Sequence, residues 1–145
     1  MDRRQILTMT ATAATLAALP TARAAEATGH HHEPVGPFKA LFESADGCVR
    51  TGLLCQAHCQ TLLAGGDRSI ADCSKSVDAL LPVCQTLAAL AAQGSVFLPR
   101  YAKLAGDVCR ACEKECRKHV KEHEQCRDCA EACARCAKNC DSVAA

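Results

Sequence analysis

Cysteine recurs at helical spacing in the C-terminal part of this chain, which has 145 residues and 13 cysteines. Between residues 109 and 140, successive cysteines are, with one break, three or four positions apart: Cys109, Cys112, Cys116, Cys126, Cys129, Cys133, Cys136 and Cys140. Alternation of three and four places side chains on one stripe of an α-helix, the stripe that leucine normally fills. Two thiols so spaced have Cβ atoms about 5–6 Å apart and can close on one ion between them. The pattern therefore indicates helices that carry rows of sulfur ligands on their buried faces.

Softness and charge favour Cu(I) as the ion that such rows bind, with multiple ions in each chain. Thiolates select soft ions. If each Cu(I) binds two sulfurs and each sulfur bridges two ions, metal and thiolate counts are equal and the core is neutral, whereas unbalanced buried charge costs several kcal/mol per ion. A zinc ion held by four thiolates leaves a site with excess negative charge. In addition, zinc and iron–sulfur sites are usually built on loops rather than along one helix. A zinc or iron–sulfur protein is therefore a third-ranked interpretation.

The predicted metal ligands are all 13 cysteines and one histidine among them. They are Cys48, Cys55, His58, Cys59, Cys73, Cys84, Cys109, Cys112, Cys116, Cys126, Cys129, Cys133, Cys136 and Cys140. His119 and His123 are candidate additional ligands. They lie four residues apart in a polar stretch, and the better expectation for them is a solvated face.

Two other roles of the cysteines stay open at this level. A single cysteine on a core stripe is usually a small buried hydrophobe, although 13 of them are hard to explain in this way. The alternative function is a disulfide-containing redox or structural helical protein. Pairs on one helix face are poorly directed for disulfide bonds, and the number of cysteines is odd. A thiol oxidoreductase also needs one exposed cysteine of low pKa with a resolving partner, and no pair stands out from its neighbours.

Four amphipathic helices with short connections are expected to position these rows, because the steps of three and four continue through the preceding part of the chain. The helices are predicted at 38–64, 69–93, from near 95 to 117, and from near 126 to 141. Gly65 and Gly66 end the first helix. Asp67 or Ser69 is expected to cap the second, and Pro82 to kink it or to remove one hydrogen bond. The fold class is therefore all-α, an antiparallel four-helix bundle with a cysteine-lined core.

In an antiparallel bundle, the ends of the first and third helices meet the starts of the second and fourth at one pole. Nine of the candidate ligands are predicted there: Cys55, His58, Cys59, Cys73, Cys116, His119, His123, Cys126 and Cys129. The row continues toward the other pole through Cys48, Cys84, Cys109, Cys136 and Cys140. Sulfur is thus expected along much of the bundle axis.

Residues 1–24 are predicted to be a signal peptide of the twin-arginine type, outside the fold. Arg3 and Arg4 precede a mildly apolar run that is too short for a membrane span, and Ala22 and Ala24 offer a small-residue cleavage site. The protein is therefore expected in the periplasm, an oxidising compartment in which bound metal would protect its thiols. Residues 25–37 are expected to be a flexible segment, and residues 38–145 the copper-binding bundle.

The remaining composition argues against several functions. The formal net charge is +1, and acids and bases are interleaved, so there is no basic stripe for nucleic acid. The sequence has no serine or acid constellation and no phosphate-binding glycine loop, so no enzyme is predicted. In the flexible segment, His30, His31 and His32 are either a metal-capturing arm or a histidine-rich tail.

The sequence resembles the bacterial copper storage proteins, in their exported branch. The resemblance covers the predicted mature chain and rests on its cysteine motifs. These are Cys-x6-Cys-x2-His-Cys from Cys48, the single Cys73 and Cys84, Cys-x2-Cys-x3-Cys from Cys109, and the row of five that ends at Cys140. The resemblance implies a four-helix bundle, often assembled into tetramers, whose core thiols hold many Cu(I) ions for storage or detoxification.

The family also implies a histidine and methionines at an open mouth of the bundle. His58 matches the histidine position. The methionines have no counterpart in that region, which leaves His58, His119 and His123 as the candidate substitutes.

Overall fold

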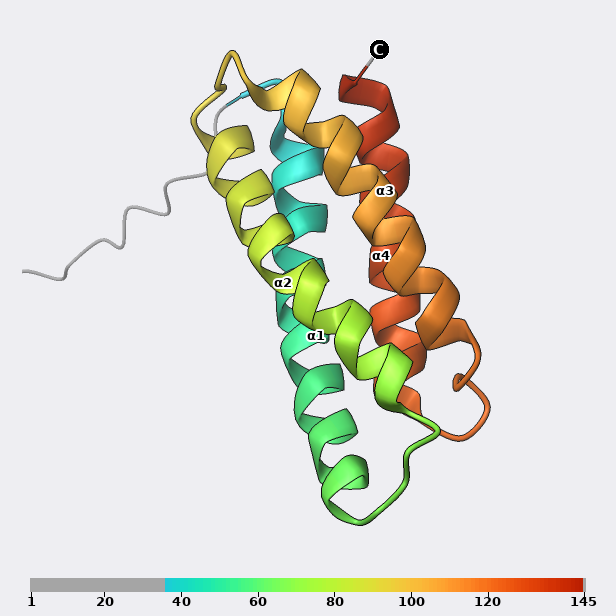
Figure 1. The fold of residues 1–145 in the computed structure, drawn as a ribbon. Coiled ribbons are helices and arrows are strands. Elements are labelled where there is room, and N and C mark those ends of the chain that lie inside the picture. The colour runs from blue at the N-terminus through green and yellow to red at the C-terminus, as the bar shows by residue number, and fades with distance from the viewer. Residues whose placement is uncertain (1–35, 145) are drawn as a thin grey trace, which may run out of the picture. The chain divides into compact units, whose positions relative to one another are not determined.

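Four α-helices make up most of residues 36–144, the part of the chain that the computed structural model describes (Figure 1). They are α1 (Lys39–Ala64), α2 (Ala71–Ala92), α3 (Leu98–Arg117) and α4 (Glu124–Val143). No strand occurs within 36–144, so the predicted fold class is confirmed. None of these helices combines the length and the apolar character that a membrane crossing needs. The predicted signal peptide and the triplet His30 to His32 lie outside the described residues.

Helices α1 and α2 end in the same kind of turn, which a glycine makes possible. After α1, Gly66 has a φ of 92°, and its N–H donates to the carbonyl of Leu63 while that of Asp67 donates to the carbonyl of Leu62. The same pair of bonds forms after α2, around Gly94 with a φ of 59°. These bonds satisfy carbonyl groups that the helix itself leaves free. Because glycine reaches such angles without a Cβ clash, the two glycines fix where the chain leaves each helix.

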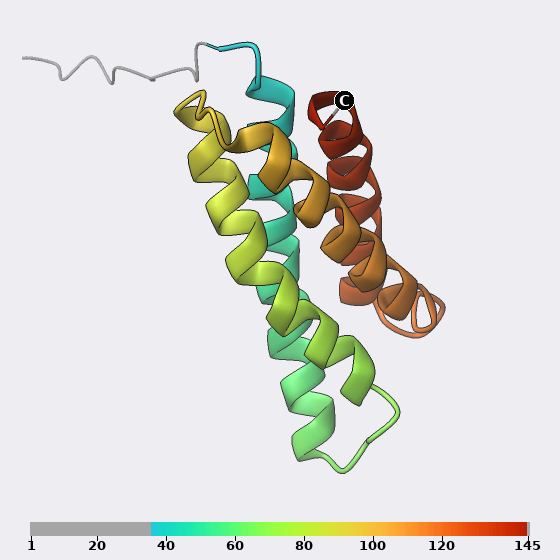
Figure 2. The same cartoon turned by 45° about the horizontal axis from the view of Figure 1, so that its top comes forward.

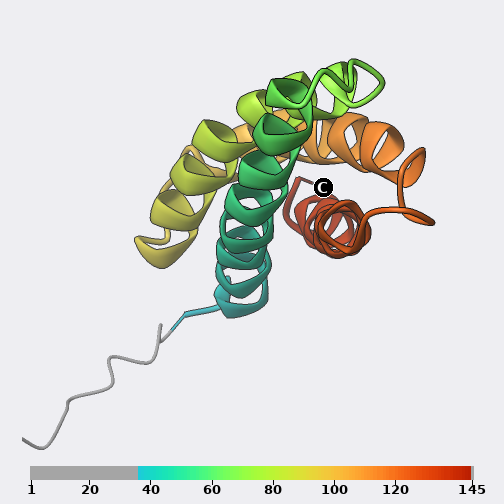
Figure 3. The ribbon, with the colours of Figure 1, turned by 90° about the horizontal axis from the view of Figure 1, so that it is seen from below.

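Each helix packs against its neighbours in sequence, and α4 closes the bundle against α1. Within residues 36–144, the backbones of α1 and α3, and those of α2 and α4, do not approach to a Cα–Cα distance of 8 Å, so these pairs lie on the diagonals. We call the pole with the connections 65–70 and 118–123 the mouth, and the opposite pole the base. Since α1 has 26 residues and α3 and α4 have 20 each, the α1–α2 turn extends beyond the α3–α4 connection (Figure 1, Figure 2). Seen from below, α4 lies nearly end-on while α1 and α2 are inclined to it (Figure 3).

Small aliphatic side chains and sulfur fill the interior. The helical turns nearest the base bury leucine and alanine, and cysteine takes over toward the mouth. The buried aliphatic residues of this base layer are Leu41, Ala45, Leu87, Ala91, Leu98 and Ala102. The inward stripes that the steps of three and four predict are buried throughout, except that Leu62 at the end of α1 is half-buried. The periodicity of the sequence therefore assigned the buried face of each helix correctly.

Two details of α2 bear on the expected helix start and on its proline. The helix begins after Ile70 with no side-chain cap. Asp67 instead accepts hydrogen bonds from the N–H of Ser69 at 2.9 Å and from its hydroxyl at 2.7 Å, so both predicted caps are used within the preceding turn. The expectation of a capped start was therefore wrong. Helix α2 continues through Pro82 to Ala92, and because proline has no N–H, one intrahelical hydrogen bond is lost as expected.

Replacing Gly66 by alanine tests the turn after α1. A Cβ at a φ of 92° crowds the backbone, so Gly66→Ala is expected to lower the free energy of unfolding by about 1–2 kcal/mol. Gly47→Ala is the matched control, because an added Cβ inside α1 meets nothing within 4 Å there. That substitution is expected to raise stability by about 0.5–1 kcal/mol. Urea unfolding of the reduced, metal-free protein measures both changes, and two effects of the same sign would contradict this account of the turn.

Candidate metal centre

All 13 cysteines lie inside the bundle as free thiols with no exposed surface. Three come from α1, two from α2, three from α3 and five from α4. Because each set follows the inner stripe of its helix, the sulfurs form one row along the axis. The row runs from Cys59 near the mouth to Cys140 near the base.

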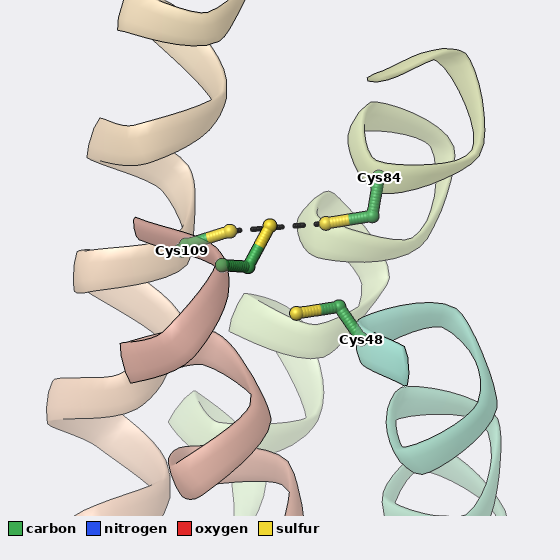
Figure 4. Close-up of side chains that lie close together, drawn as sticks. Cys48, Cys84 and Cys109 are labelled. Carbon is green, nitrogen blue, oxygen red and sulfur yellow. Dashed lines mark hydrogen bonds between the residues drawn. The ribbon is translucent and has the colours of Figure 1, made fainter. Parts of the chain in front are cut away.

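Four sulfurs, one from each helix, meet in the group nearest the base, which we call the base quartet. It consists of Cys48, Cys84, Cys109 and Cys136, whose Sγ atoms all lie within 4.8 Å of one another. Three of these side chains, from α1, α2 and α3, point toward one another in Figure 4. The Sγ atoms of Cys84 and Cys109 are 3.8 Å apart. Residues far apart in the sequence thus form a compact four-sulfur group.

A second group of four, the mouth quartet, lies at the other end of the row. It consists of Cys55, Cys59, Cys73 and Cys126, again with all Sγ atoms within 4.8 Å of one another. The Sγ atom of Cys126 lies 3.9 Å from that of Cys55 and 4.0 Å from that of Cys73. Helices α1, α2 and α4 therefore share this group.

Two groups of three connect the quartets. One is Cys55, Cys116 and Cys129, and the other is Cys112, Cys129 and Cys133. Cys55 and Cys129 each belong to two groups. Cys116 also lies close to α2, with its Sγ 3.5 Å from that of Cys73. Shared sulfurs thus link the mouth quartet to both groups of three. The base quartet shares no sulfur with them, and a hydrogen bond between Cys48 and Cys133 links it to the rest of the row.

The closest pairs of sulfurs are spaced for metal coordination. If an ion lies about 2.3 Å from each sulfur, a typical metal–thiolate distance, sulfurs 3.5 and 4.0 Å apart subtend angles of about 100° and 120° at the ion. These are close to the angles of tetrahedral and trigonal coordination. The sequence suggested pairs along one helix, whereas the structure also offers groups of three and four drawn from several helices.

Hydrogen bonds between thiols make one sulfur in each part of the row easier to ionise than its neighbours. S–H groups of Cys126, Cys55 and Cys73 lower the pKa of Cys59 in the mouth quartet. In the base quartet, the pKa of Cys136 is lowered by donors that include Cys109 and Cys140. A thiolate that accepts several hydrogen bonds is stabilised in the charged form.

Thiols that donate hydrogen bonds to another sulfur of the row, such as that of Cys129, are correspondingly hard to ionise. The pKa of Cys116 is raised by hydrogen bonds to Cys112 and Cys129 first, and by burial. The pKa of Cys133 is raised in the same way by Cys112 and Cys129. Much of the metal-free row is therefore protonated at neutral pH, and a bound ion must displace protons from it.

Three of the six histidines gather at the mouth. The Nε2 atom of His58 lies 3.0 Å from Nδ1 of His123, and the ring centroid of His119 lies 6.4 Å from that of His123. All three side chains are half-buried. His119 and His123 therefore do not occupy the solvated face expected for them. The reason is that residues 118–123 turn back across the end of the bundle, where the N–H of His123 donates to the carbonyl of His119 at 2.9 Å.

A polar cluster between α1 and α2 was missed by the sequence analysis. The amide nitrogen of Gln56 donates to Oδ1 of Asp78 at 2.5 Å, and the hydroxyl of Ser74 donates to Oε1 of Gln56 at 3.4 Å. Gln56 and Ser74 are both buried. Each directly follows a cysteine of the mouth quartet, Cys55 or Cys73. The cluster therefore holds α1 and α2 at the register that brings these two thiols together, and a polar residue beside each cysteine was the available signal.

The sequence profile of one protein family, described as copper storage protein, matches residues 35–145 of this chain. The chain belongs to the copper storage protein family. The resemblance predicted from the cysteine motifs is thus confirmed. A curated relative, the uncharacterized cysteine-rich protein YhjQ of Bacillus subtilis (strain 168), is 39% identical over 66 residues. That match covers 43% of this chain and 59% of the relative, so it spans less than two thirds of that protein.

Solved structures of copper storage proteins share the fold. Apo-Csp3 (copper storage protein 3) from Bacillus subtilis is 28% identical, with a TM-score of 0.65, and the match covers 74% of this chain and 98% of that one. The Cu(I)-bound copper storage protein BsCsp3 is 29% identical, with a TM-score of 0.62 and coverage of 74% and 97%. Ccsp from Streptomyces lividans, loaded with 10 copper equivalents, has a TM-score of 0.67 at 24% identity, with coverage of 85% and 92%, and supports the fold alone.

Binding of a soft monovalent ion such as Cu(I) is expected to weaken as the pH falls. The pKa values of Cys116 and Cys133 are raised above the ordinary 9.0, so both thiols are protonated throughout the range of about pH 6–8 and protons compete with the ion there. Competition with a Cu(I) chelator at several pH values, corrected for the titration of the chelator, measures the change. The release of protons on copper binding, followed in weakly buffered solution, is the companion measurement. If the distribution of copper between the protein and the chelator did not change with pH, the assignment of protonated thiols would be contradicted.

Proposed function

We propose that this protein stores Cu(I), with many ions in each chain, in the thiol row of its bundle. The observation that carries the proposal is the overlap of the sulfur groups, which share Cys55 and Cys129. A shared sulfur can bridge two ions, and bridging keeps the number of thiolates equal to the number of monovalent ions. The buried core is then neutral and needs no counter-ions. Unbalanced charge in the core would cost several kcal/mol per ion. The copper bound in the related Cu(I)-loaded BsCsp3 is consistent with this use of the fold.

Copper reaches the row at the mouth in this proposal. The base is packed with leucine and alanine, whereas the mouth carries half-buried imidazoles beside the mouth quartet. His58 is the first ligand, with His123 beside it and His119 as a further candidate. Ions then exchange between neighbouring sulfurs toward the base quartet. No chemical transformation of an organic substrate is involved, so the function is binding rather than enzymatic.

The cellular setting rests on the sequence. The leader in residues 1–24 supports export by the twin-arginine route to the periplasm, with residues 38–145 as the copper-binding bundle. Assembly into tetramers is proposed from the family resemblance. A store in this compartment both holds copper for later use and keeps it from reacting elsewhere.

The arrangement of sulfur favours metal storage over a disulfide-based function. The thiols lie in groups of three and four that share members, whereas a disulfide framework separates its cysteines into pairs. No member of the row is exposed to a protein substrate, as a thiol oxidoreductase would require.

An anaerobic titration of the fully reduced protein with Cu(I) tests the proposal directly. In competition with a coloured chelator, the protein is expected to withhold about one ion per thiol, of which there are 13. Saturation at one or two ions would contradict storage, since most of the thiols would then only fill space in the core.

Single substitutions of neighbouring cysteines in α4 test whether the quartets act as units. Cys136→Ala removes a sulfur that lies within 4.8 Å of three others and is expected to lower the Cu(I) capacity by more than one ion. Cys140→Ala is the matched control, because this equally buried thiol belongs to none of the groups, and it is expected to cost at most about one ion. The same titration reads both variants. Equal losses would mean that each thiol binds copper independently.

A further inference from the structure

The two imidazoles at the mouth lie at a spacing that suits adjacent ligands of Cu(II) better than the two ends of a linear Cu(I) site. Their facing nitrogens, Nε2 of His58 and Nδ1 of His123, share a hydrogen bond of 3.0 Å, whose proton a bound ion would displace. If an ion lies about 2.0 Å from each nitrogen, the two nitrogens, 3.0 Å apart, subtend an angle of about 97° at that ion. Adjacent ligands in the tetragonal coordination of Cu(II) are close to a right angle. A linear two-coordinate ion would instead hold the nitrogens roughly 4 Å apart at the same bond length.

The donor atoms change from nitrogen at the mouth to sulfur inside the bundle, and this change also favours Cu(II) first and Cu(I) afterwards. Imidazole nitrogen suits copper in its divalent form, whereas thiolate selects Cu(I). The nitrogens lie at the half-buried mouth, and the sulfurs lie beyond them with no exposed surface. Cys59, a member of the mouth quartet, directly follows His58 in α1 and interacts electrostatically with its imidazole. An ion held by the imidazoles is therefore next to a group of thiols, which are reductants of Cu(II).

A carboxylate adds negative charge on the same side of the mouth. Asp67 interacts electrostatically with His123 and with His119. It lies in the connection between α1 and α2, held by hydrogen bonds from the backbone and the hydroxyl of Ser69. A carboxylate held beside the imidazoles favours an incoming divalent cation.

We propose that the His58 and His123 pair captures Cu(II) and that thiols of the mouth quartet reduce it to Cu(I), which then joins the thiol row. This step rests on the proposed storage function, because the product needs a Cu(I) store to receive it. Two Cu(II) ions each accept one electron, two cysteine thiols supply these electrons, one S–S bond forms between the two sulfurs, and two protons pass to solvent. Cys55 and Cys126 are one pair able to do this, since their Sγ atoms are 3.9 Å apart and both belong to the quartet. The reaction is stoichiometric and ends when the quartet is oxidised.

Mixing the reduced, metal-free full chain with Cu(II) glycinate in the absence of oxygen tests the proposal. Loss of the Cu(II) signal in electron paramagnetic resonance reports reduction, and a thiol assay after removal of copper reports what was oxidised. The Cu(II) signal is expected to disappear with the loss of one thiol per Cu(II). In the variant His58→Asn with His123→Asn, the rate is expected to fall at least about tenfold, the lower end of what removal of a supporting group costs a metal site.

The matched control removes the other histidine group. The variant His30→Ala with His31→Ala and His32→Ala keeps the mouth intact and is expected to reduce Cu(II) at the rate of the unaltered chain. Because all 13 thiols remain in the mouth variant, its Cu(I) capacity is expected to fall by at most about one ion, the one that His58 would hold. A capacity this close to that of the unaltered chain shows that the variant is folded and that its thiol store is intact. A failure of the storage function would instead appear as a low Cu(I) capacity of the unaltered chain.

Three results would overturn the proposal. An unchanged rate in the mouth variant would mean that Cu(II) attacks the thiols directly. A slower rate in the triplet variant would transfer capture to His30, His31 and His32. A Cu(II) signal that persists, or a thiol count that does not fall, would mean that the quartet is not the electron donor.

Discussion

The interior of this bundle must be packed and must also offer ligands, and cysteine meets both requirements at once. A free thiol packs as a small hydrophobe, so burying 13 of them costs the metal-free fold little. The same sulfurs lie 3.5 to 4.0 Å apart where their distances are closest, which is a spacing for bridging ions. In the proposed function the ligands are also the core, so the metal sites are assembled when the helices pack. Loading would then require the exchange of protons for copper and no change of fold.

The chemistry of the interior changes along the axis, and the antiparallel topology is the reason. The base combines the start of α1, the end of α2 and the start of α3, which bury leucine and alanine. The mouth combines the opposite ends, which carry the histidines and the polar turns. Aliphatic packing thus closes one end of the row, sulfur occupies its length, and nitrogen lies at the other end. This order gives copper a single direction of uptake in the proposed function.

Register between helices decides which sulfurs meet. A helix that slips by one residue turns its side chains by about 100° relative to its partner, which would take its thiols out of every group. The hydrogen bonds from the buried Ser74 to the buried Gln56, and from Gln56 to the exposed Asp78, oppose such a slip between α1 and α2, because a slip would separate the partners. Loss of pairing for a buried polar group costs about 1–3 kcal/mol. A few polar contacts therefore define the geometry of a core made of small, similar side chains.

The sequence by itself determined the number of helices, their approximate limits and the buried face of each, because these follow from local periodicity and from turn residues such as Gly66. It also determined the class of ion, since thiolate softness does not depend on the fold. Only the tertiary structure decided that Cys48, Cys84, Cys109 and Cys136 form one group, and that His123 lies against His58. Periodicity fixes the direction of a side chain about its own helix axis. It does not fix how far one helix is displaced along another, which depends on many small packing and hydrogen-bond contributions between residues distant in the chain.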